Sequence, residues 1–230
     1  MRKQFLIYIF VLTTSVVSAQ LYEVGAFLGG SNYIGDIGPT TYINPNTIAV
    51  GGIAKFNWTP RITFRGTLIY TNLQSDDTDS NNDYRRNRVP SFNFKNKILE
   101  GSIGVEFNFF KYNLSKIGFT QTPYIIAEVG AVNYSVISEQ INPTTFATKR
   151  VTSVVIPFGM GYKMKLAQNV GIAIETSFRY TFKDVIDYNN HAINEPRTNF
   201  GNPNSDDWYV FTGITVVYAF GRPGCYKGAF

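Results

Sequence analysis

The feature that most constrains this chain is the strict alternation of apolar and polar side chains, which recurs in eight segments. It is clearest over residues 170–182, where one face holds Val170, Ile172, Ile174, Phe178, Tyr180 and Phe182 and the other holds small, polar and charged residues. Successive side chains of a β-strand point to opposite faces of the sheet. Each segment is therefore predicted to be a strand with one apolar face, which would be the core of a soluble sandwich or the lipid-facing side of a membrane barrel.

The first 19 residues have the pattern of a cleavable signal peptide. A basic start at Arg2 and Lys3 precedes an apolar run over residues 5–12, and Val17, Ser18 and Ala19 are the small residues expected before a cut ahead of Gln20. The run is shorter than the roughly 20 apolar residues of a membrane-spanning helix. We expect three regions: a signal peptide (1–19), an outer-membrane barrel (20–220) and a short periplasmic tail (221–230).

The spacing of the segments separates the membrane barrel from the soluble sandwich. The predicted strands are residues 21–30, 47–58, 61–73, 94–110, 123–136, 151–165, 170–182 and 207–220. Long and short connections alternate between them, as extracellular loops and periplasmic turns do in bacterial outer-membrane barrels. Aromatic residues gather at the strand ends, where lipid headgroups would lie: Phe56, Trp58, Phe107, Phe109, Phe110, Trp208, Tyr218 and Phe220.

The polar face of the strands carries charge of both signs. Its charged residues are Lys55, Arg65, Glu100, Glu106, Glu128, Lys163, Glu175 and Arg179. Burying such groups unpaired in a soluble core would cost too much free energy. An eight-stranded barrel is just wide enough inside for side chains, so four acids and four bases are predicted to form a neutral internal network rather than an ion pathway. The fold class is all-β: an eight-stranded antiparallel transmembrane β-barrel with long extracellular loops and short periplasmic turns.

The sequence gives little support to catalysis, cofactors or nucleic acid. The single histidine, His191, lies in the longest predicted loop without a partner for acid–base work. One histidine and one distant cysteine cannot form a metal site, and the glycines near Gly29 lie in a strand rather than before a helix, so they do not form a phosphate loop. A net charge of +5 without a basic helix does not indicate nucleic-acid binding. We expect no enzyme, no cofactor and no metal.

Two segments resemble a known family. The mature chain opens with EVGAFLGGSNYIGDIG at residues 23–38 and closes with VYAFGRPGCY at residues 217–226. In these segments it resembles the PorG-like outer-membrane barrels of the type IX secretion system, including the short tail with a cysteine after the last strand. The resemblance covers essentially the whole mature chain.

The resemblance implies a structural role in protein secretion. PorG-like barrels are associated with the periplasmic ring of the secretion machine, which is built by a lipoprotein and a partner of the PorK and PorN type. The chain would then be an anchor or docking component in the outer membrane, surrounded by outer-membrane lipids. We expect the contact with the ring proteins to be made by the largest periplasmic elements, which are the tail and residues 111–121. The candidate contact residues are Lys111, Tyr112, Lys116, Phe119, Cys225, Tyr226 and Lys227.

The sequence is compatible with three alternatives. Cys225 is either a free thiol in a flexible tail or one half of an intermolecular disulfide, since an unpaired cysteine in an exported chain can pair across chains. The barrel could instead be a surface adhesin that binds ligands through its long extracellular loops, although such polar runs usually stay solvated. A brace to peptidoglycan is disfavoured because the tail is too short to form a domain.

Overall fold

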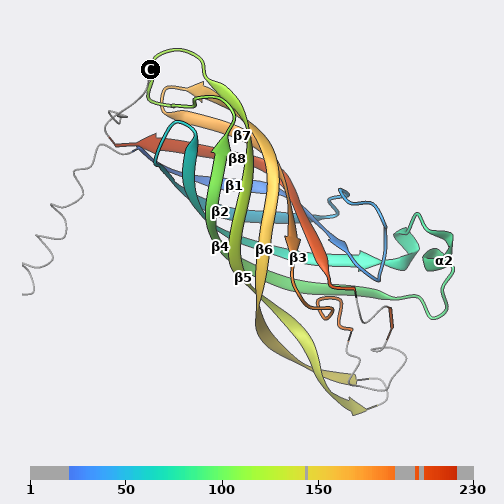
Figure 1. Cartoon of the computed structure of the whole chain (residues 1–230). Helices are drawn as coiled ribbons and strands as arrows, with labels where there is room; N and C mark the ends of the chain where they lie inside the picture. The colour runs from blue at the N-terminus through green and yellow to red at the C-terminus, as the bar shows by residue number, and fades with distance from the viewer. Residues whose placement is uncertain (1–20, 143–144, 190–199, 202–204, 222–230) are drawn as a thin grey trace, which may run out of the picture.

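A computed structural model describes residues 21–142, 145–189, 200–201 and 205–221. Eight antiparallel strands close into one barrel in which each strand pairs with its neighbours in the chain and β8 pairs with β1 (Figure 1). The start of β1 and the end of β8 lie at the same end, with Tyr22 opposite Phe220. The predicted fold class is confirmed, and the signal peptide, residues 222–230 of the tail and His191 lie outside the described residues.

Within the barrel wall, most strand residues alternate between buried and more exposed positions. Their bounds are β1 Leu21–Ile34, β2 Thr47–Asn57, β3 Ile62–Asp76, β4 Asn93–Asn108, β5 Gln121–Asn142, β6 Thr145–Ala167, β7 Val170–Tyr180 and β8 Trp208–Phe220. The β3–β4 connection carries the 3-10 turn η1 (Asp77–Asp79) and the short helix α2 (Asp83–Arg86). Across the described ranges, no helix is both long and apolar enough to cross a membrane.

The largest departure from expectation is a hairpin. Residues 137–150 were predicted to be a loop, but they complete β5 and β6, which are 22 and 23 residues long and stay paired with each other beyond the barrel wall. The pairing of β4 with β5 ends at Leu99 and Asn133, and that of β6 with β7 ends at Ile156 and Tyr180. The projecting part is mostly exposed on both faces, so its sequence lacks the apolar face by which strands are recognised.

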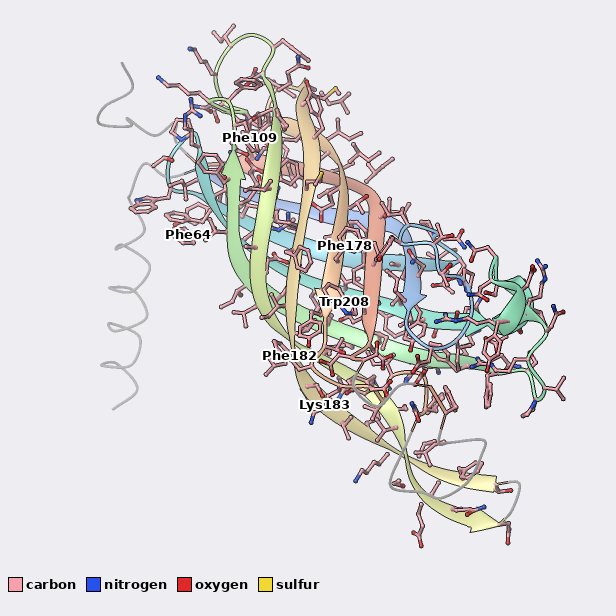
Figure 2. All side chains as sticks on the ribbon, turned by 45° about the vertical axis from the view of Figure 1, so that its right-hand side comes forward. Phe64, Phe109, Phe178, Phe182, Lys183 and Trp208 are labelled. Atoms are coloured by element: carbon pink, nitrogen blue, oxygen red, sulfur yellow. The ribbon has the colours of Figure 1, made fainter. Side chains whose placement is uncertain are left out.

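The outer surface of the barrel is apolar. Exposed large apolar side chains occur on every strand, and on β6 alone they are Val154, Ile156, Phe158, Met160, Tyr162, Met164 and Leu166. Contacting aromatic rings flank this surface at both ends: Tyr22, Phe56, Phe64 and Phe220 at one, and Phe158, Phe178, Tyr180 and Trp208 at the other. Figure 2 shows Phe64 of the first group well separated from Phe178 and Trp208 of the second. An apolar band between two aromatic girdles is the exterior of a barrel that spans a bilayer, and the chain is a bacterial outer-membrane protein.

The interior is layered. A charged layer lies between two apolar clusters, one built around Phe27, Tyr33, Tyr209 and Phe211 and a smaller one of Ile53, Tyr112, Leu114, Val217 and Ala219. The long β1–β2, β3–β4 and β7–β8 connections lie at the end of the barrel that holds the larger apolar cluster, which is therefore extracellular. The start of β1, the end of β8 and the short β2–β3 and β6–β7 turns lie at the opposite, periplasmic end. The barrel positions its polar residues in a closed space between these clusters.

Candidate functional site

All eight charged residues predicted to face inward are buried inside the barrel. Glu106 is the centre of one group: its carboxylate lies 2.7 Å from Lys55 Nζ and 3.4 Å from an Arg65 nitrogen, and it also pairs with Lys163. Lys163 further stacks over the Tyr112 ring at 4.5 Å. Strands β2, β3, β4 and β6 contribute these groups, so the network ties together strands that are not neighbours in the wall.

Arg65 extends the network across the barrel. Its guanidinium lies 3.0 Å from Glu128 and makes two contacts to Glu175, at 3.0 and 3.1 Å. The Tyr124 hydroxyl donates to Glu175 at 2.8 Å. The planar guanidinium of arginine presents several N–H donors in fixed directions, whereas the ammonium of lysine acts as a single compact charge. An arginine is therefore suited to bridge three carboxylates at this position.

A second pair lies toward the extracellular side. Arg179 Nε donates to Glu100 at 3.2 Å, and the Tyr209 hydroxyl donates to the other oxygen of Glu100 at 2.5 Å. The guanidinium also lies 4.2 Å from the centre of the Phe211 ring. This pair joins the charged layer to the extracellular apolar cluster.

One interior acid was missing from the sequence-based set. Glu23 is 2% exposed and accepts a hydrogen bond from the Asn57 side chain at 2.8 Å. The strands therefore bury five acids against four bases, and the predicted neutral balance was wrong by one charge. The alternation in β1 contains the signal, because Glu23 shares the inward face with the buried Phe27.

The barrel's own connections fill both mouths. At the periplasmic end, Tyr112 and Leu114 of the β4–β5 connection (residues 109–120) pack against Ile53 and Val217 inside the wall. At the extracellular end, Ile186 of the β7–β8 connection joins the larger cluster and is fully buried. Side chains thus occupy the barrel at the periplasmic, middle and extracellular levels.

The parts of the β1–β2 and β7–β8 connections around Ile37 and Ile186 close the extracellular mouth, and we call them the extracellular cap. Buried acids hold this cap in place. The Tyr33 hydroxyl lies 2.9 Å from Asp187 and also contacts Asp207, whose other oxygen accepts the Ile186 N–H at 2.8 Å. One hydroxyl proton cannot serve both carboxylates at once. Burial raises the pKa of Asp187 to about 7, and burial together with the charge of Asp187 raises the pKa of Asp207. A proton held by this pair therefore stabilises the cap.

The same cap brings together oxygen atoms that a cation could use. Asp36, Asp184 and Asp187 each place a carboxylate oxygen within 4.8 Å of the others. Oxygen ligands suit calcium and magnesium. Clusters of acidic groups are common without an ion, so we assign no metal to this one.

The candidate contact residues divide into three groups. Lys111, Lys116 and Phe119 are exposed at the periplasmic end, as a contact surface requires. Tyr112 was wrongly chosen: only 5% of it is exposed, because it fills the barrel mouth. The tail residues Cys225, Tyr226 and Lys227 lie outside the described part of the chain.

Comparisons with known proteins give one family and several structures of similar fold. The model of a family described as "Domain of unknown function (DUF6089)" matches residues 2–229. No curated protein matches the chain. Similar solved structures include the N-terminal β-barrel domain of Pseudomonas aeruginosa OprF (TM-score 0.46, 13% identity, 88% of this chain and 98% of that chain). A major outer membrane protein from Thermus thermophilus gives a TM-score of 0.48 at 13% identity over 88% of this chain and 100% of that one.

Neisserial surface protein A is similar to the same degree, with a TM-score of 0.46 and 11% identity over 88% of this chain and 98% of that chain.

Proposed function

We propose that this chain, which belongs to the DUF6089 family, is a non-catalytic anchor or docking component of the type IX protein secretion machinery. In this role the barrel is held in the outer membrane by lipid, and its periplasmic end contacts the ring lipoprotein and its partner, of the PorK and PorN type. The resemblance of residues 23–38 and 217–226 to PorG-like barrels supports the assignment to this machinery.

The observation that carries the proposal is the filled interior. Paired charges occupy the middle of the barrel, and the two apolar clusters occupy its ends. An ion or solute pathway would need water-accessible charge, whereas the side chains of Lys55 and Glu106 are 2% and 0% exposed. The surfaces that remain for function are those at the two ends.

The periplasmic end supplies an ordered docking platform. The β4–β5 connection is anchored by Tyr112, whose N–H donates to the Pro60 carbonyl at 3.0 Å, and by the buried Leu114. Residues held in this way keep their positions when a partner binds, so less conformational entropy is lost on association. The strand β8 ends at the periplasmic end of the barrel, and the tail follows it in the sequence.

The test is copurification of the full chain after crosslinking in cells. We expect the ring lipoprotein to be recovered with the wild type and to be lost when residues 221–230 are deleted. The deletion leaves Phe220 at the end of β8, so the barrel should still insert. Failure of the wild type to recover any ring component would contradict the assignment to the secretion machinery.

The cysteine offers a finer test of the same contact. If Cys225 forms a disulfide with a partner, the wild type should run as a larger species on a non-reducing gel and the Cys225→Ser variant should not. Identical migration of the two proteins would show that the thiol is free and that the contact, where present, is noncovalent.

A second candidate function is ligand binding at the cell surface. The projecting β5–β6 hairpin supports it, because the outer edge of β6 has no strand partner before Ile156 among the described residues, and such edges can accept a strand from another protein. Shortening the hairpin should then abolish binding of host or matrix ligands while leaving periplasmic copurification intact.

A further inference from the structure

The exposed charge at the periplasmic end has one sign. Arg61, Lys111 and Lys116 are exposed there and Lys165 is half-buried. Among the described residues of this end (21–23, 57–61, 108–121, 163–170 and 218–221) the only carboxylate is that of Glu23, which is buried inside the barrel. A surface with several cations and no exposed acid attracts anionic groups.

Large apolar side chains accompany these cations. Ile117 is 93% exposed, Phe119 is 68% exposed, and Leu166, at the end of β6, is 63% exposed. Two hydrogen bonds from Lys165 fasten the connection to β6: its N–H donates to the Thr120 carbonyl at 2.9 Å and its ammonium donates to the Lys116 carbonyl at 2.6 Å. The apolar side chains are thus held beside the lipid-facing wall.

The position of this segment along the barrel matches the headgroup layer. Phe109 contacts the outward-facing Phe107, and its N–H donates to the Pro123 carbonyl at 3.1 Å, which places the edge of the apolar band near this level. Figure 2 shows Phe109 at the same end as the connection. Phe119 is two residues before the start of β5 at Gln121, or roughly 7 Å at a strand's rise. The headgroup layer on each side of a bilayer is about 5–7 Å thick.

We infer that the outer edge of the β4–β5 connection binds the headgroups of anionic phospholipids in the periplasmic leaflet. Ile117 and Phe119 enter the interface between headgroups and acyl chains, and Lys111 and Lys116 contact the lipid phosphates. These residues line a groove of about 420 Å³ together with Pro60. Aromatic and lysine side chains are the usual anchors at this depth.

Continuity favours lipid over an acidic peptide as the occupant. The exposed Leu166 follows the outward-facing Tyr162 and Met164 along β6, and Gln121, two residues after Phe119, pairs with Met164. Outward-facing strand residues of a membrane barrel contact lipid. A peptide bound here would have to displace the lipid that surrounds the barrel. The inference assigns the exposed residues of this connection to lipid, so the ring contact of the docking proposal would be made by the tail.

The test uses the full chain reconstituted in vesicles with tryptophan as a reporter. In a Trp58→Phe, Trp208→Phe background, Phe119→Trp places the only tryptophan at the proposed site. Brominated phosphatidylglycerol and brominated phosphatidylcholine are compared as quenchers at equal mole fraction. We expect the anionic lipid to quench more strongly, with a binding preference of about two- to fivefold, given the attraction of each basic side chain to an anionic surface.

Charge-removal variants separate the cations from the apolar contact. Lys111→Gln with Lys116→Gln should bring the preference close to one while quenching itself persists. The matched control is Lys149→Gln with Arg150→Gln on the extracellular hairpin, which should leave the preference unchanged. Equal quenching by both lipids in the parent protein would overturn the headgroup site. Water-like emission without quenching would also overturn it and would favour an acidic peptide as the occupant.

Discussion

Replacing Glu106 by Gln should destabilise the barrel strongly, although it brings the formal charge of the buried strand residues to zero. The side chain of Glu106 is fully buried and pairs with Lys55, Arg65 and Lys163. Arg65 keeps two other acids after the substitution, but no other ion pair of Lys55 or Lys163 is present among the described residues. If only the total charge mattered, the variant would be at least as stable as the wild type.

The size of the effect follows from the two cations left behind. Removing one partner of a buried ion pair typically costs about 3–5 kcal/mol, because the remaining charge is buried without compensation. The glutamine oxygen can still accept one hydrogen bond, so we expect a loss of about 3–5 kcal/mol rather than twice that amount. Glu100→Gln is the matched control: its single cation, Arg179, keeps hydrogen bonds to the Ser177 carbonyl and hydroxyl. We expect that loss to be smaller.

The assay is urea unfolding of the barrel in lipid vesicles, followed by the mobility difference between folded and unfolded forms on a gel. Glu106→Leu combined with Lys55→Met and Lys163→Met should recover most of the loss, because apolar residues of similar volume can replace a buried charge cluster. A Glu106→Gln variant within about 1 kcal/mol of wild type would refute the reasoning and would imply that water solvates the interior.

Three further predictions concern the wall and the cap. Ile174→Arg on the lipid face should destabilise by about 2–4 kcal/mol near the midplane, whereas the inward Ser177→Ala should cost about 1 kcal/mol; equal losses in the same urea assay would mean that the two faces are misassigned. The raised pKa of Asp187 means that cap stability is greatest below pH 3.8 and falls as the pH rises toward about 7; hydrogen exchange at the cap should speed up over this range, and less so in Asp207→Asn. Gly29→Leu should block barrel closure, because its Cβ would lie 2.6 Å from the Cα of Gly213 on β8; a folded, heat-modifiable variant would contradict this.

The wall of the barrel was predictable because one rule governs it. Side-chain alternation alone assigned the outward Ile103 and Val129 and the inward Lys55 and Arg179, and the structure confirms these assignments. Every outward-facing strand residue contacts lipid and every inward-facing one lies in the narrow interior. The polarity of each residue therefore indicates its face without reference to distant parts of the chain.

The ends of the barrel were less predictable because they depend on contacts between distant segments. Nothing local distinguishes Tyr112, which fills the mouth, from Phe119, which is exposed seven residues later. The partners of Tyr112 are Ile53 and Val217, which lie on strands far away in the chain. Likewise, the pairing of Asp187 and Asp207 through Tyr33 arises only when the β7–β8 connection folds back over β1.

The length of the β5–β6 hairpin gives the molecule a mechanical property. At about 3.3 Å per residue, strands of 22 and 23 residues run for roughly 70 Å, about twice the thickness of the hydrocarbon core. One ladder of hydrogen bonds therefore reaches from the periplasmic rim to a point well outside the membrane. A pull along its axis loads many of these bonds in shear at once, and the packed interior keeps the wall from buckling. A load on the outer end of the hairpin would therefore be distributed along this ladder down to the periplasmic rim.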